Sequence, residues 1–138
     1  MSAAAIRFPY RVRDLARPEG SLAPLLPVLL AGAVQVEALA LLDTGAAVNV
    51  LPHSLGVRLG CDWTTASAGL RLTGNLAALE ARGVLLAATV GTFPETRLAF
   101  AWTRTDEVPL LFGQVNFFQE FDVCFFRARQ CFEVRPRG

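Results

Sequence analysis

The chain has 138 residues, of which 53% are hydrophobic, and its formal net charge at neutral pH is +1. This length and composition predict a single folded domain with a sizeable core, and they argue against a disordered chain. The balanced charge argues against bulk electrostatic attraction to nucleic acid or to an anionic membrane, so neither is expected as a partner.

Three cysteines and a single histidine limit the metal and redox chemistry of the chain. The number of cysteines is odd, and their spacing is not that of a disulfide framework (Cys61, Cys124 and Cys131). This predicts reduced thiols inside a cell. No cysteine pair has metal-ligand spacing, and His53 alone cannot supply the usual histidine-containing zinc signatures. The apolar run at 22–34 is too short to span a bilayer. We therefore expect a soluble, cytoplasmic protein without a metal or another cofactor.

The first predicted element is a half-buried strand at Ile6–Arg13, where apolar and polar residues alternate and Pro9 suggests a sheet edge. Its arginine and aromatic residues also fit a nucleic-acid patch, but a solvated strand face is the better interpretation. A turn or short linker at Arg17–Gly20 follows. Leu25–Leu30 and Val34–Leu42 are then predicted as strands joined by a turn.

Asp43 follows the second of these strands and begins the most informative stretch of the chain. An ionised Asp at the end of a buried strand is costly unless its oxygens accept hydrogen bonds. Thr44, Gly45 and Ala46 supply a hydroxyl, a freely turning backbone and little bulk, so a tight turn can direct backbone N–H groups at the carboxylate. The alternative is an ordinary Asx-turn, but such turns usually lie at a solvated surface, whereas both arms here are apolar.

A short strand at 48–51 precedes Pro52, which predicts the start of a brief helix that ends near Gly60. His53 lies in the first turn of this helix and is expected at the surface. A catalytic role would require a nearby nucleophile, and the adjacent Ser54 is poorly placed for that geometry.

The second half of the chain consists of short apolar or alternating runs separated by turn residues. Gly74-Asn75 is a hairpin-type dipeptide, although a helix over Asn75–Ala81 is an alternative. Val108–Gly113 is predicted as a second buried strand that ends in glycine, and Gln114–Glu120 as a short helix. The other predicted strands are 70–73, 76–79, 84–90, 97–102, 121–126 and 131–135. This regular spacing predicts an all-β barrel or sandwich with one or two small helices.

Three parts in this order resemble the retropepsin-like single-domain aspartic peptidases. Asp43–Ala46, placed after a hydrophobic strand, resembles their active-site loop, and Leu111–Gln114 stands where they carry a hydrophobic-hydrophobic-glycine motif. The hairpin at Gly74-Asn75 lies between these parts, where the family has its flap, with Gly69 and Gly83 as alternative positions for the flap tip. The resemblance implies an all-β acid-protease fold, built as a closed or partly open β-barrel.

The resemblance also divides the expected single domain, 1–138, into three parts. An N-terminal extension or edge strand occupies 1–21, a peptidase-like core occupies 22–126, and a C-terminal strand and tail occupy 127–138.

The resemblance implies that the chain is an aspartic endopeptidase, expected to hydrolyse peptide bonds in extended, apolar-flanked polypeptide segments. Its chemistry needs two carboxylates that share a proton around one water molecule. Only Asp43 has the Thr-Gly context, which the other aspartates of the chain lack (Asp14, Asp62, Asp106 and Asp122). The second carboxylate is therefore expected from another copy of the chain, across the two-fold axis of a homodimer.

The resemblance implies supporting roles for the residues that follow Asp43. Thr44 would reach across the axis to the partner loop, Gly45 would admit the substrate backbone, and Ala46 would keep the floor of the site shallow. A catalytically weak or inactive dimer that serves as a peptide-binding or assembly module is the alternative function.

Further residues are implied to bind the substrate. Gly74 and Asn75 would belong to the flap, which pairs with an extended peptide as an added strand. Pro109 and Leu111 would line subsites, with plain core packing as an equal alternative. Leu111 can also face inward while Leu110 faces the cleft, because neighbours in a strand point to opposite sides.

Overall fold

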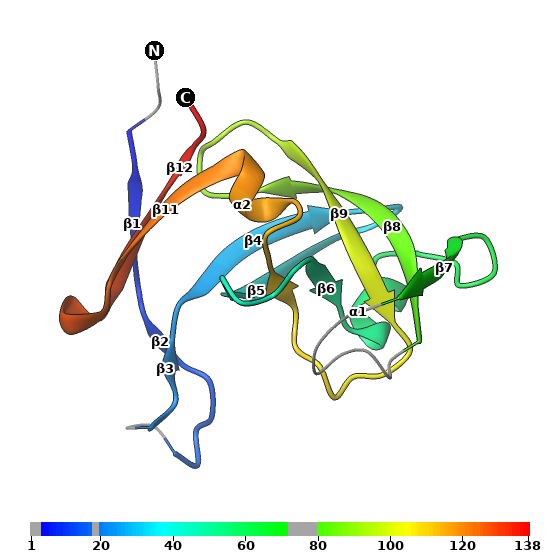
Figure 1. Ribbon diagram of the computed structural model, residues 1–138, viewed down its shortest axis with the longest axis horizontal. Helices are drawn as coiled ribbons and strands as arrows, with labels where there is room; N and C mark the ends of the chain where they lie inside the picture. Colours follow the sequence, from blue (N-terminus) through cyan, green and yellow to red (C-terminus); the bar gives the residue numbers. More distant parts are fainter. Residues whose placement is uncertain (1–3, 18–19, 72–79) are drawn as a thin grey trace.

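The computed structural model describes residues 4–17, 20–71 and 80–138 of the chain. Strands form most of its regular structure, together with two short α-helices (Figure 1). The strands are β1 (Ile6–Pro9), β2 (Arg11–Val12), β3 (Leu22–Ala23), β4 (Leu25–Ala31), β5 (Gln35–Leu42), β6 (Asn49–Leu51), β7 (Ser67–Arg71), β8 (Glu80–Thr89), β9 (Thr96–Thr103), β10 (Leu111–Phe112), β11 (Phe121–Phe126) and β12 (Cys131–Pro136). The α-helices are α1 (His53–Arg58) and α2 (Phe117–Glu120), and η3 (Arg127–Arg129) is a short 3-10 helix. The expected all-β fold with short helices is confirmed.

Six strands follow one another in a ring, which we call the strand ring. Their order is β4-β5-β10-β6-β9-β8, and β8 pairs back with β4 where Leu30 faces Ala88. Most neighbours are antiparallel, but β10 is parallel to β5 and β6 is parallel to β9. β7 extends the sheet beyond β8. The ring-like arrangement turns the inward faces of its strands toward one another.

The hydrophobic core fills the strand ring and continues beneath the ends of the chain. In β4 every second side chain is buried, namely Leu26, Val28 and Leu30, as expected for a strand with one face in the core. The rings of Phe112 and Phe117 are fully buried and stack with centroids 4.5 Å apart. Burying one such side chain contributes roughly 1.5–3 kcal/mol of transfer free energy, so these aromatic residues fix α2 against β10.

A second, three-stranded sheet is built from the two ends of the chain, in the order β1-β12-β11, and we call it the terminal sheet. Figure 1 shows it standing beside the strand ring, with β1 and β12 side by side. Phe132 of β12 is fully buried and stacks with Phe8 of β1 at 5.5 Å. Arg7 and Glu133 form an ion pair at 2.8 Å across the same two strands. The N-terminal and C-terminal segments therefore form one unit of structure.

Helix α1 begins after Pro52, as the sequence predicts, and His53 in its first turn is half-buried where the sequence analysis expected a surface residue. The imidazole of His53 stacks on Trp102 with ring centroids 5.5 Å apart, and Trp63 packs edge-on against both rings. The Nδ1 atom of His53 is buried. We call these three residues the aromatic cluster. Local sequence patterns do not predict this cluster, because Trp63 and Trp102 reach His53 from separate segments of the chain.

Two arginines lie against Trp63 of the aromatic cluster. The guanidinium groups of Arg82 in β8 and Arg104 lie 4.8 and 5.4 Å from the ring centroid of Trp63. Arg82 also donates a hydrogen bond to the Trp63 carbonyl. These cation–π contacts join the loop before β7 to β8 and to the segment directly after β9.

Asp106 caps the start of α1 from a distant loop. Its Oδ1 accepts a hydrogen bond from the Ser54 N–H at 2.7 Å, and this bond holds the pKa of the Asp106 carboxyl below its ordinary value of 3.8. Because the folded-state pKa is depressed, the stabilisation is complete above the ordinary value and is lost as the pH falls through the folded-state pKa.

We therefore expect Asp106→Asn to lower the melting temperature at neutral pH. The difference in melting temperature between this variant and the wild type should become smaller as the pH falls below the ordinary Asp pKa. Thermal unfolding followed by circular dichroism over a pH series measures this. A gap that stays constant over that range would contradict the assigned role.

Some predicted elements differ from those observed. The strand expected over Val108–Gly113 is reduced to β10, because residues 108–110 have no regular partner strand. The strand expected at 76–79 lies outside the described residues. No helix in the part of the chain that the structure describes is long and apolar enough to cross a membrane.

Candidate active site

The loop from Asp43 to Val48, here called the Asp43 loop, joins two strands that are not neighbours. It connects β5 to β6, and β10 lies between them. The N–H of Leu41 donates to the Leu110 carbonyl at 2.9 Å, and the N–H of Asp43 donates to the Phe112 carbonyl at 3.0 Å. The aspartate is therefore fixed at the end of β5 by a strand that arrives from far along the chain.

The turn after Asp43 directs a backbone donor at its carboxylate, and the bond has the form of the Asx-turn that the sequence analysis gave as the alternative. The Gly45 N–H donates to Oδ1 of Asp43 at 3.0 Å, and the Ala46 N–H donates to the Asp43 carbonyl at 3.0 Å. A Cβ at Gly45 would lie 3.3 Å from Oδ1, so a larger residue would crowd the carboxylate. In this single chain Thr44 and Gly45 are exposed, whereas Asp43 and Ala46 are half-buried.

The two residues directly after β10, Gly113 and Gln114, pack against the Asp43 loop and hydrogen-bond to it. The side chain of Gln114 donates through Nε2 to the Thr44 carbonyl at 2.8 Å, and its N–H donates to the Ala46 carbonyl at 2.9 Å. A Cβ at Gly113 would lie 2.5 Å from the Val48 carbonyl oxygen and 2.7 Å from that of Ala46. Only glycine permits this approach of one backbone to the other. The structure thus brings together the two motifs that the sequence placed about seventy residues apart.

A buried amide network, which the sequence analysis missed, holds the same region. The side chain of Asn49 is fully buried and accepts a hydrogen bond from the Gly113 N–H at 2.9 Å. Its Nδ2 donates to the Ala99 carbonyl at 2.9 Å and to Oδ1 of Asn116 at 3.2 Å. The network joins β6, β9 and the segment before α2. The available signal was a lone amide in the otherwise apolar run at 48–51.

We expect Asn49→Ala to lower the free energy of unfolding by about 2–3 kcal/mol, because it leaves the buried Gly113 N–H and Ala99 carbonyl unpaired. Urea unfolding followed by circular dichroism measures the loss. Gln35→Ala, which truncates an exposed amide, is the control and should change stability by less than about 0.5 kcal/mol. Equal effects of the two substitutions would refute the proposed importance of the network.

The remaining predicted site residues lie in different surroundings. Leu111 is buried and pairs with Leu41 in the strand before Asp43. Leu110 is buried as well, whereas Pro109 is exposed in the segment before β10. Gly74 and Asn75 lie outside the described residues.

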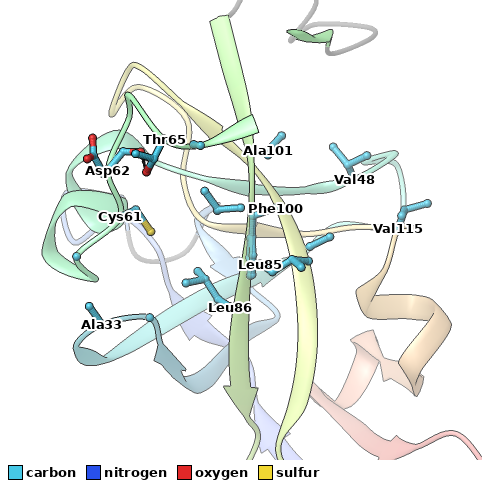
Figure 2. Close-up of a pocket in the computed structure, with 16 residues that line it drawn as sticks. Ala33, Val48, Cys61, Asp62, Thr65, Leu85, Leu86, Phe100, Ala101 and Val115 are labelled. Carbon is cyan, nitrogen blue, oxygen red and sulfur yellow. Dashed lines mark hydrogen bonds between the residues drawn. The ribbon is translucent and has the colours of Figure 1, made fainter. Parts of the chain in front are cut away.

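A cavity of about 780 Å³ opens beside the end of the Asp43 loop. Figure 2 shows Cys61, Asp62 and Thr65 on one side of it and Val48, Ala101 and Val115 on the other. Most of its lining is aliphatic or aromatic, and it reaches the loop through Val48 but does not include Asp43. In one chain, therefore, this cavity and the Asp43 carboxylate are adjacent but separate.

Other chemical groups near this cavity offer little catalytic potential. Burial raises the pKa of the Cys61 thiol, which is therefore protonated at neutral pH and a poor nucleophile. Hydrogen bonds from the hydroxyl and backbone of Thr64 lower the pKa of Asp62, which stays an ionised cap of its own turn. Within residues 4–17, 20–71 and 80–138, no three His, Cys, Asp or Glu side chains are grouped to hold a metal ion.

Solved structures are similar to this fold. A retropepsin-like aspartic protease from Rickettsia conorii matches with a TM-score of 0.68, over 99% of this chain and 96% of that chain, at 16% sequence identity. The chain has a retropepsin-like fold. The EIAV protease, solved in complex with the inhibitor HBY-793, shares the fold with a TM-score of 0.54 over 67% of this chain and 82% of its own, at 20% identity.

The retropepsin-like fold implied by the sequence motifs is thus confirmed at the level of the backbone. No protein-family model matches the sequence, and a search among curated proteins finds no similar chain. At such low identity the solved structures establish the retropepsin-like fold alone. What the residues of the site do must be argued from their own geometry.

Proposed function

We propose that this chain is an aspartic endopeptidase that acts as a homodimer on extended polypeptide segments. The observation that carries the proposal is the Asp43 loop of a retropepsin-like fold, seated on Gly113 and Gln114 with its carboxylate held by the Gly45 N–H. Two solved proteins of the same fold are named as proteases, and one of them holds an inhibitor.

The chemistry requires a second carboxylate close to the first. Two carboxylates that lie together cannot both ionise easily, so they share one proton and divide the roles of acid and base. The ionised carboxylate takes a proton from a water molecule, whose oxygen attacks the scissile carbonyl. The protonated one donates to the carbonyl oxygen, and a proton then passes to the leaving amine. No covalent enzyme intermediate forms.

A second copy of the chain is the proposed source of that carboxylate. Thr44 and Gly45 form the exposed tip of the Asp43 loop, so another loop can approach them in a two-fold arrangement. Thr44 would then hydrogen-bond across the axis and keep the two carboxylates in register. Within the described residues, Oδ2 of Asp43 accepts no hydrogen bond, which leaves it available to the water and to the partner.

The apolar cavity supports an apolar substrate. Val48 links the cavity to the Asp43 loop, and its aliphatic lining favours an apolar side chain near the cleaved bond. Leu111, beside Leu41, and the exposed Pro109 remain proposed subsite residues, and Gly74 and Asn75 remain the proposed flap. The chain has no disulfide between its three cysteines, which supports a reducing compartment such as the cytoplasm.

A peptide library tests the proposal directly. The purified protein would be incubated with a diverse peptide pool from acidic to neutral pH, and new termini would be identified by mass spectrometry. We expect cleavage between apolar residues. Binding of peptides without any cleavage at any pH would instead favour a peptide-binding or assembly module.

A further inference from the structure

Charge is divided unevenly between two parts of the chain. Residues 1–23 and 121–138, which form the terminal sheet together with β2 and β3, contain eight arginines and four acidic residues. Residues 24–120, which include the strand ring, contain five arginines and eight acidic residues. The formal charge of +1 for the whole chain therefore conceals a basic unit, with a net charge of +4, beside a part that is net negative.

Part of the surplus of arginine lies in a row along β1 and β2. Exposed and half-buried side chains alternate over 6–13. The exposed positions are Arg7, Pro9, Arg11 and Arg13. Side chains two residues apart in a strand share a face and are separated by about 6–7 Å. Arg7 is paired with Glu133, whereas Arg11 and Arg13 form no ion pair within the described residues.

The turn between β11 and β12 adds two more arginines beside this row. The Tyr10 N–H donates to the Gln130 carbonyl at 2.8 Å, which places η3 next to the junction of β1 and β2 (Figure 1). The guanidinium of Arg127 lies 5.7 Å from the ring centroid of Tyr10, and that of Arg129 lies 5.7 Å from that of Phe126. Neither forms an ion pair with a described residue. The rings hold these cations in place, and their N–H donors face no carboxylate there.

A hollow with an apolar floor lies beside the basic row. Its volume is about 720 Å³, and Arg11 lines it together with Pro27 and Leu29 of β4 and Leu39 of β5. The side chain of Leu39 is 44% exposed, so part of this apolar floor faces the solvent. Glu37 also contributes to the lining. An arginine next to an apolar hollow fits a ligand that carries an anionic group next to an apolar one.

We propose that this surface binds an acidic segment of a polypeptide in which an apolar residue accompanies the carboxylates. We call it the arginine face, and it comprises the hollow and Arg11, Arg13, Arg127 and Arg129. Guanidinium and carboxylate groups form charge-assisted, often bidentate hydrogen bonds. Glutamates two residues apart in an extended chain are separated by about 6–7 Å, which matches the spacing of the row.

Two features favour a polypeptide over a nucleic acid as the partner. The hollow is suited to an apolar side chain, and a phosphate backbone carries none. Proteins that bind single-stranded nucleic acid commonly stack its bases on aromatic rings. On the arginine face the rings of Tyr10 and Phe126 are already in contact with guanidinium groups.

The inference rests on the proposed function for its biological meaning. Leu39 precedes Asp43 by four residues in the chain, which corresponds to about 13 Å along β5. A substrate chain at Asp43 therefore needs a spacer of roughly four extended residues to reach the hollow. The arginine face then holds a protein substrate by an acidic segment outside the cleaved sequence and lowers the KM of cleavage.

Peptide binding tests the arginine face without any cleavage. Fluorescence anisotropy would follow a labelled Glu-Glu-Leu-Glu-Glu peptide with blocked ends on Asp43→Asn protein, with Gln-Gln-Leu-Gln-Gln and a short oligouridylate as comparisons. We expect Arg11→Ser combined with Arg13→Ser to weaken the dissociation constant of the Glu peptide by about 10-fold or more. Arg58→Ser combined with Arg97→Ser is the matched control, because it removes two exposed arginines elsewhere, and it should bind as the parent protein does.

Two further variants keep the test decisive if the first one does not fold. Arg127→Ser combined with Arg129→Ser should also weaken binding, whereas Glu37→Gln should strengthen it, because it removes a negative charge from the hollow. Added salt should weaken binding of the Glu peptide. The inference would be overturned by equal affinities of all these variants, by absence of binding, or by tighter binding of the oligouridylate than of the peptide.

Cleavage separates this inference from the proposed function. A peptide that the library shows to be cleaved would be extended by a short linker and Glu-Glu-Leu-Glu-Glu. We expect its KM to fall by about 10-fold with kcat unchanged, and Arg11→Ser combined with Arg13→Ser to remove this gain. Equal KM values with and without the extension would refute the arginine face but leave the endopeptidase standing. Binding of the Glu peptide by a wild type that cleaves no peptide would refute the endopeptidase and retain the arginine face.

Discussion

Asp43→Asn is expected to lower peptide cleavage by at least about a thousandfold while the protein stays folded and dimeric. Removing a positioned general acid or base typically costs a factor of about 10²–10⁴, and in a homodimer this substitution removes both carboxylates at once. The amide has almost the same shape and can still accept the Gly45 N–H, so the loop keeps its geometry. It cannot take a proton from water, which is the step that cleavage needs.

The comparison uses the same peptide pool for all variants, with initial rates measured by mass spectrometry and the mass of the assembly by sedimentation. Asp106→Asn is the matched control, because it removes a carboxylate that caps α1 and lies outside the Asp43 loop. This control should cleave as the wild type does. Equal cleavage by Asp43→Asn and wild type would exclude the aspartic mechanism, whatever the oligomeric state.

The second large effect, a loss of stability, is expected when Gly113 is replaced by alanine. An alanine there would place its Cβ 2.5 Å from the Val48 carbonyl oxygen, well inside van der Waals contact. Neither backbone can retreat easily, because Gln114 and Asn49 tie both segments together. We expect Gly113→Ala to lower the free energy of unfolding by about 3 kcal/mol or more, with the melting temperature falling by about 10 °C or more.

Thermal and urea unfolding of the purified variants measure this loss. Gly20→Ala is the matched control, since a Cβ at Gly20 would meet no atom within 4 Å. The control should change the free energy of unfolding by less than about 1 kcal/mol. If Gly113→Ala unfolded like this control, the close packing of the Asp43 loop on β10 would not matter for stability.

The sequence predicted those parts of the fold that depend on local pattern. Alternating burial in β4, the apolar approach of β5 to Asp43 and the start of α1 after Pro52 are all visible as periodicity or turn chemistry. The tight turn at Gly45 was predictable for the same reason, because its donor and acceptor are two residues apart. The retropepsin-like order of motifs then supplied the overall fold.

Features that depend on distant contacts could not be predicted in this way. Asn49 and Asn116 bond across 67 positions of the chain, and periodicity does not carry that information. The same applies to the stack of His53 on Trp102, because the sequence analysis expected His53 at the surface and the two residues are 49 positions apart. The flap assigned to Gly74 and Asn75 lies outside the described residues and stays a prediction.

The aromatic cluster makes this protein easy to observe. Trp63 and Trp102 are the two tryptophans of the chain, and their ring centroids are 5.0 Å apart. The tryptophan fluorescence therefore arises from one region of the structure, near β8 and the loop before β7. There the guanidinium of Arg82 lies against the indole of Trp63. A ligand that shifts this hairpin will change the emission spectrum without any attached dye.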